Sequence, residues 1–258
     1  MADSAHPHIK LGILRVLGES LSLFFRRFPL FFMIAVIPAL LLALIGVWIS
    51  PPEFQTATPE GLGVAWEYDT APGIVLMLVN MIVFVLVMGL TTLAAYDGLS
   101  GRPLRLPVYL SRCLAALPAI VLLGLAFYLM MVVGLLFFVL PGLYIAARYM
   151  VFVPAILIDR AGFSGLSRAA ALTQGYRWPI VGGLVLMMLV YVALSMATLP
   201  LIGLVAEGVL GVLGFSVLEA ALSAIINAFS AVFTALLYAR LREIKEGLGL
   251  RDLAEVFA

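Results

Sequence analysis

Charged residues, cysteine and histidine are all scarce in this sequence of 258 residues. Asp, Glu, Lys and Arg make up 11% of the chain and hydrophobic residues make up 64%. A soluble domain is about one quarter charged and about half apolar, and so few charges do not cover this much apolar surface in water. The composition excludes a disordered chain, a nucleic-acid-binding protein and a water-soluble enzyme of ordinary make-up. It predicts that lipid surrounds the chain.

The scarcity of cysteine and histidine limits the chemistry that the chain can perform. The single cysteine, Cys113, rules out an internal disulfide, and we interpret it as an inert, packed thiol. The two histidines, His6 and His8, lie in a polar N-terminal segment that we interpret as a solvated tail, with weak metal binding as the alternative. No nucleotide-binding, serine-hydrolase or zinc-protease motif occurs. We therefore expect no enzyme activity, no cofactor and no metal site.

Long apolar runs are abundant, and six of them reach or approach the length of about 20 residues that a membrane span needs. The predicted spans are Phe28–Ile49, Pro72–Tyr96, Leu114–Leu140, Leu143–Ile158, Pro179–Leu199 and roughly Val212–Tyr238. Pro141-Gly142 separates the third span from the fourth as a turn signal. A single kinked helix or a re-entrant pair is the alternative there. Pro38 and Pro154 are expected to kink their spans.

The positions of the basic residues predict the orientation. With six spans, both termini lie on one side, and that side holds all but one of the 15 Lys and Arg residues. The opposite side carries a long acidic loop, from Ser50 to Ala71. We therefore expect a multi-pass protein of a bacterial inner membrane, with both termini in the cytoplasm.

A short motif recurs before three of the predicted spans: an amphipathic segment, a proline, and then two spans. The prolines are Pro29, Pro118 and Pro179, and proline suits the first turn of the helix that follows. We predict a single all-α membrane domain, residues 1–258, in which an interfacial amphipathic helix, a proline elbow and a helical hairpin occur three times. The predicted units are residues 9–97, 104–159 and 164–240, followed by a cytoplasmic tail, residues 241–258. Chance resemblance between apolar segments is the alternative.

Polar residues inside the predicted spans are the main candidates for a site, because burying them is unfavourable unless they are partnered. Arg148 and Glu219 lie at similar predicted depths and are expected to pair, with Glu207 as the competing partner. Snorkelling of Arg148 to the outer headgroups is a further alternative. Such a pair more often sets helix register than performs a reaction.

The sixth predicted span carries polar residues at intervals of three or four, which places them on one helical face. They are Glu219, Ser223, Asn227, Ser230, Thr234 and Tyr238. Asn80 in the second span is positioned to meet this stripe. Hydrogen bonding between helices is the simpler interpretation, and a polar, hydrated path or pocket is the other.

Three short motifs resemble a known family. They are Pro141-Gly142-Leu143-Tyr144 followed by Arg148, Gly165-Leu166-Ser167-Arg168-Ala169-Ala170-Ala171-Leu172-Thr173-Gln174-Gly175 after Asp159, and Tyr238-Ala239-Arg240-Leu241-Arg242-Glu243-Ile244-Lys245-Glu246-Gly247. Together they resemble the bacterial YciC-like membrane proteins and the membrane domain attached to some glycerophosphodiester phosphodiesterases. The resemblance implies a polytopic helical protein of the inner membrane. The sequence lacks the soluble phosphodiesterase domain, which argues against catalysis.

We expect a non-enzymatic membrane protein whose interfacial helices bind anionic lipid headgroups or a membrane partner. The candidate headgroup contacts are Arg26, Arg27, Arg112 and Arg177. A small transporter with a polar pathway along the sixth span is one alternative, and an accessory subunit of a larger membrane complex is another. A homo-oligomer also remains open. An enzyme that acts on a lipid headgroup is disfavoured, because no nucleophile–base pair or metal set is visible.

Overall fold

The computed structural model describes residues 11–49, 71–205 and 208–247. Within these ranges every regular element is a helix, which agrees with the predicted all-α class. The elements are α1 (Ile13–Arg26), α2 (Phe28–Ile49), α3 (Ala71–Leu99), α4 (Leu106–Phe137), α5 (Val139–Tyr149), α6 (Phe152–Ile158), the short 3-10 turn η2 (Gly162–Ser164), α7 (Gly165–Leu172), α8 (Arg177–Val205) and α9 (Gly208–Glu246).

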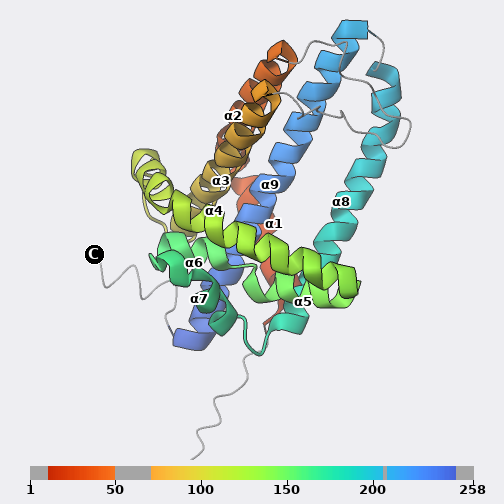
Figure 1. Cartoon of the computed structure of the whole chain (residues 1–258). Coiled ribbons are helices and arrows are strands. Elements are labelled where there is room, and N and C mark those ends of the chain that lie inside the picture. The colour runs from red at the N-terminus through yellow and green to blue at the C-terminus, as the bar shows by residue number, and fades with distance from the viewer. Residues whose placement is uncertain (1–10, 50–70, 206–207, 248–258) are drawn as a thin grey trace, which may run out of the picture.

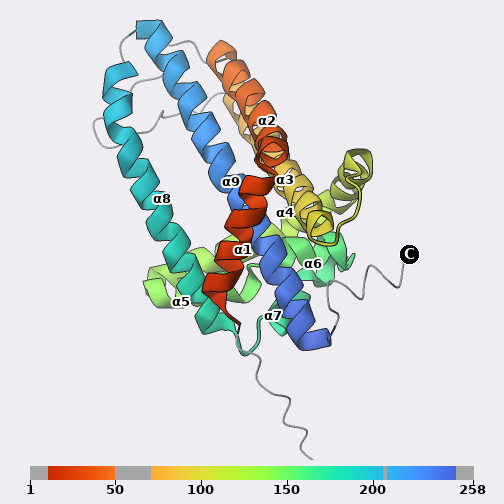
Figure 2. The same cartoon turned by 180° about the vertical axis from the view of Figure 1, so that it is seen from behind.

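The long helices α2, α3, α8 and α9 have roughly aligned axes and alternate in chain direction, and α1 lies beside the C-terminal half of α9 (Figures 1 and 2). Helix α9 is central, because α1, α2 and α3 all pack against it. The small residues Ala228, Ala231 and Ala235 of α9 are buried and let the neighbouring helices approach closely. Helix α9 also continues to Glu246, so the predicted cytoplasmic tail begins as helix.

Among the described residues, five helical segments are long and apolar enough to cross a membrane. The pair formed by α7 and α8, bent by 102°, makes a sixth if it counts as one broken span. The chain therefore has the helices of a multi-pass membrane protein. Residues 50–70, which make up almost all of the predicted acidic loop, lie outside the described residues. His6, His8 and Glu207 also lie outside them.

The turn between the predicted third and fourth spans differs from the prediction. Helix α4 ends at Phe137, Phe138 is extended, and α5 begins at Val139. Pro141 therefore lies in the first turn of α5 rather than at the break. Proline is tolerated there, because residues in the first turn of a helix donate no amide hydrogen bond within the helix.

The predicted fourth span lies within Val139–Ile158, one of the five segments that are long and apolar enough to cross a membrane, but this segment is divided into two helices. The chain leaves the helical path at Met150 and Val151, and α6 begins at Phe152. Pro154 lies in the first turn of α6 and has no amide hydrogen to donate to the carbonyl of Met150. The kink that was expected at Pro154 is therefore a break between two helices.

Helices α4 and α5 pack against each other as a hairpin that lies across the long helices in both views (Figures 1 and 2). Helix α4 also runs through Pro118 without interruption, so the second predicted interfacial segment is not a separate helix. In the other two copies of the motif, separate helices α1 and α7 come before the helices that contain Pro29 and Pro179. A helix boundary thus precedes the proline in two of the three places.

Candidate functional site

Charged side chains from distant parts of the chain meet at one end of the helix bundle. Arg240 of α9 donates hydrogen bonds of 3.0 and 2.9 Å to the two carboxylate oxygens of Glu19 in α1. Arg240 also binds Glu243 at 2.7 Å, and Arg15 donates to Glu19 at 3.0 Å. Burial alone would raise the pKa of Glu19, but the hydrogen bonds from Arg240 and Arg15 outweigh it and hold this pKa below its ordinary value.

A second group of ion pairs joins α6, α7 and α9 at the same end. Arg242 lies 3.2 Å from Asp159 and 3.0 Å from Glu246. Arg168 donates to Asp159 at 2.8 Å and also pairs with Glu246. Basic residues that the sequence predicted on one side therefore do lie at one end. Their carboxylate partners come from the chain itself, so these pairs hold helices together.

The four predicted headgroup contacts have a different environment. Within the described part of the chain, none of them forms an ion pair: Arg26, Arg27, Arg112 and Arg177. Arg26 and Arg112 are exposed, whereas Arg27 and Arg177 are half-buried. Arg177 donates to the Tyr144 hydroxyl at 2.7 Å, which places it between α5 and α8.

The structure places Arg148 toward the charged end. Its carbonyl accepts a hydrogen bond of 2.8 Å from Thr173 Oγ1, at the end of α7, and its guanidinium lies 5.2 Å from the centre of the Tyr149 ring. Its buried Nε has no hydrogen-bond partner among the described residues.

Glu219 lies on α9, although its side chain is outside the described residues. It is separated from Glu246, at the charged end, by about 40 Å of helix axis. The structure therefore does not bring Arg148 and Glu219 together. Arg148 is near the opposite end of the molecule from the one that the sequence predicted.

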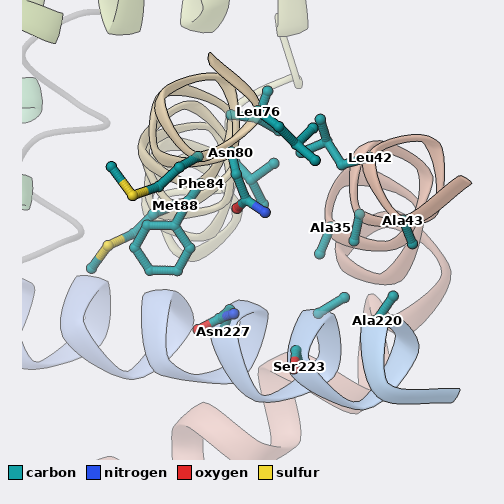
Figure 3. Close-up of a pocket in the computed structure, with 15 residues that line it drawn as sticks. Ala35, Leu42, Ala43, Leu76, Asn80, Phe84, Met88, Ala220, Ser223 and Asn227 are labelled. Carbon is teal, nitrogen blue, oxygen red and sulfur yellow. The ribbon is translucent and has the colours of Figure 1, made fainter. Parts of the chain in front are cut away.

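The second candidate site is a cavity of about 270 Å³ between α2, α3 and α9 (Figure 3). Its walls are mostly apolar, and they carry three polar side chains, Asn80 from α3 and Ser223 and Asn227 from α9. In Figure 3 the Asn80 amide points from α3 into the space that faces α2 and α9. Asn80 thus lines the same cavity as two residues of the predicted stripe.

The cavity lies far from the charged end. Asn227 is about 20 Å of helix axis from Arg240, and Asn80 is about 26 Å from Asp97. Both values fall within the hydrocarbon thickness of about 30 Å.

The polar stripe on α9 does not form one continuous path. Thr234 donates to the carbonyl of Ser230 at 2.8 Å, within the helix itself. Tyr238 is fully buried, and its ring lies 6.4 Å from that of Tyr96. The half of the stripe near the charged end is therefore packed in the core, and of the stripe side chains that the structure describes, Ser223 and Asn227 line the cavity.

One polar contact was missed from the sequence. Tyr109 donates a hydrogen bond of 2.6 Å to Asp97 and so joins the start of α4 to the end of α3. A loop separates the two residues, so helical periodicity gives no signal for the pair. Cys113 is buried, as expected of an inert thiol, and contacts α3 at Gly89.

In comparisons with family models, curated proteins and solved structures, no match to the chain was found. The resemblance to YciC-like proteins therefore rests on the three short motifs.

Proposed function

We propose that this chain is a non-enzymatic protein of a bacterial inner membrane that binds anionic lipid headgroups at its charged end. The supporting observation is a feature that recurs at this end of the molecule. An arginine that forms no ion pair within the described structure is followed or preceded in the sequence by an exposed apolar residue. Phe25 beside Arg26 is 64% exposed, and Trp178 beside Arg177 is 65% exposed. Leu114, two residues after Arg112 in α4, is also exposed.

Such neighbours are typical of a membrane interface, where the apolar side chain enters the acyl region and the cation reaches a phosphate. Helix α1 has this character along its length. Val16 and Phe24 are buried against the bundle, whereas Leu14, Leu21 and Phe25 lie on another strip and are exposed. Contact of this apolar strip with lipid acyl chains is more favourable than its contact with water.

The charge distribution supports a cytoplasmic location for this end, and with it for both termini. A threefold organisation and a relation to YciC-like proteins belong to the same proposal. Helices α1 and α7, each followed by a helix with proline in its first turn, support the first and third units.

Lipid extraction from the protein purified in nanodiscs, followed by mass spectrometry, tests the proposal. We expect anionic lipid to be enriched around the parent protein relative to the supplied mixture, and less so around the double variant R26Q/R112Q. The matched control is R15Q/K245Q, which removes the same charge from the same end at residues outside the candidate set. Absence of enrichment, or equal loss in both double variants, contradicts headgroup binding at these residues.

A small transporter is the second candidate, and the cavity between α2, α3 and α9 favours it. Transporters often bind their substrates near the bilayer midplane, between helices. Asn80, Ser223 and Asn227 offer uncharged donors and acceptors between helices, in the half of the bundle away from the charged end. Solute flux into proteoliposomes, compared between the parent and the variants E219Q and N227L, tests it. Equal flux, or no flux, removes the transporter.

A further inference from the structure

Between the arginines at its two ends, Arg112 and Arg148, the α4–α5 hairpin is apolar. Between Arg112 and Arg148 the sequence holds no charged residue, no histidine, no Asn or Gln, and no Ser or Thr. The residues at its turn are also the most exposed part, with Leu136 at 80%, Phe137 at 78% and Phe138 at 74%. If the turn emerged into water on the far side of a bilayer, exposure of this apolar surface would raise the free energy by about 25 cal/mol per Å². The turn therefore belongs in hydrocarbon.

The helices α5 and α6 together, Val139–Ile158, are long and apolar enough to cross a bilayer, but the part of this arm that precedes Arg148 is not. From Val139 to Arg148, α5 covers about 14 Å of helix axis, roughly half of the hydrocarbon thickness of about 30 Å. The hydrogen bond from Thr173 holds Arg148 toward the charged end. The turn at Phe138 thus reaches the middle of the bilayer at most.

The base of the hairpin enters the bundle at a shallow depth. Gly89 of α3 faces both Cys113 of α4 and Leu157 of α6, the helix that follows the hairpin. Gly89 is about 12 Å of helix axis from Asp97, whose carboxylate binds Tyr109. From this level the hairpin runs across the long helices rather than along them (Figures 1 and 2).

We infer that the α4–α5 hairpin does not cross the bilayer and lies within the cytoplasmic half, where the acyl chains of that leaflet cover it. It forms an apolar interaction surface for one leaflet, and Arg112 and Arg148 at its two ends face the headgroups of the same leaflet. The chain then crosses four times, through α2, α3, α8 and α9. This inference goes beyond headgroup binding at Arg26, Arg112 and Arg177, and it can fail while that proposal holds.

Single cysteines placed in the full-length protein test the inference. The test variant is F138C at the turn of the hairpin. The control for the cytoplasmic side is P103C, in the loop between α3 and α4. The control for the opposite side is T56C, between α2 and α3. The parent, whose Cys113 is buried, gives the background of labelling.

A membrane-impermeant maleimide is added first to intact spheroplasts and then to inverted vesicles. We expect T56C to react only in spheroplasts, P103C only in inverted vesicles, and F138C in neither. A spin label on F138C in proteoliposomes should be relaxed by oxygen, which dissolves in acyl chains, and not by a water-soluble nickel chelate. Labelling of F138C from the T56C side means that the hairpin crosses. Labelling from the P103C side, or protection from both relaxing agents, means that acyl chains do not cover the turn. Each of these results overturns the inference.

Discussion

Arg240 binds both carboxylate oxygens of Glu19 and so joins α9, the last described helix, to α1, the first. The contact also defines one end of the molecule, because Arg242, Asp159 and Arg168 lie in the adjacent group of ion pairs. A chain with few charges uses several of them here to hold its helices together.

Removal of this contact should lower the stability of the protein slightly. Both side chains are about one third exposed, and exposed ion pairs are worth about 0 to 1 kcal/mol. We expect E19Q and R240Q each to lower the thermal unfolding temperature in detergent, and the double variant to lose less than the sum of the two. Additive losses in this double-mutant cycle would show that the two residues do not interact.

Acidification should weaken the same contact. Because the pKa of Glu19 in the folded protein is lowered, its contribution to stability is present above the pKa of the unfolded chain and is lost as the pH falls through the folded value. As the pH falls below 4.5, the ordinary pKa of a glutamate, the unfolding temperature of the parent should therefore decrease more than that of E19Q. Parallel pH profiles would contradict the assignment.

The α4–α5 hairpin should tolerate no added methyl group where its arms approach most closely. A Cβ at Gly142 would lie 2.5 Å from the Leu135 side chain and 3.1 Å from its backbone nitrogen. We expect G142A to destabilise the protein by about 1 to 3 kcal/mol, as overpacking does.

G182A is the matched control, because a Cβ at Gly182 meets nothing within 4 Å. Alanine favours a helix over glycine by about 1 kcal/mol, so this control should be neutral or stabilising. Equal destabilisation by the two variants would show that the approach of α4 and α5 is not tight.

Local pattern predicts the helices of this protein better than their arrangement. The predicted first span, Phe28–Ile49, coincides with α2, because hydrophobicity and length determine a helix in lipid. The polar residues within the predicted spans also included the three polar side chains that line the cavity, Asn80, Ser223 and Asn227. The depth of Arg148 was wrong, because counting residues along a span assumes an unbroken helix aligned with its neighbours. The break at Met150 and the crosswise hairpin remove both assumptions.

Charge counting could not reveal the crosswise hairpin. Four crossings and six crossings both return the chain to the side on which it began, so the basic residues have the same distribution in either case. The distinction comes from the short α5 helix and from the apolar turn at Phe138.

The most direct test of the account is the location of the chain termini. Epitope tags fused to both ends are exposed to external protease, first in intact spheroplasts and then after lysis. If the charged end faces the cytoplasm, both tags stay intact until the membrane is broken and are then digested. Digestion of either tag in intact spheroplasts would place that terminus outside and contradict the proposed orientation, and with it headgroup binding at the inner leaflet.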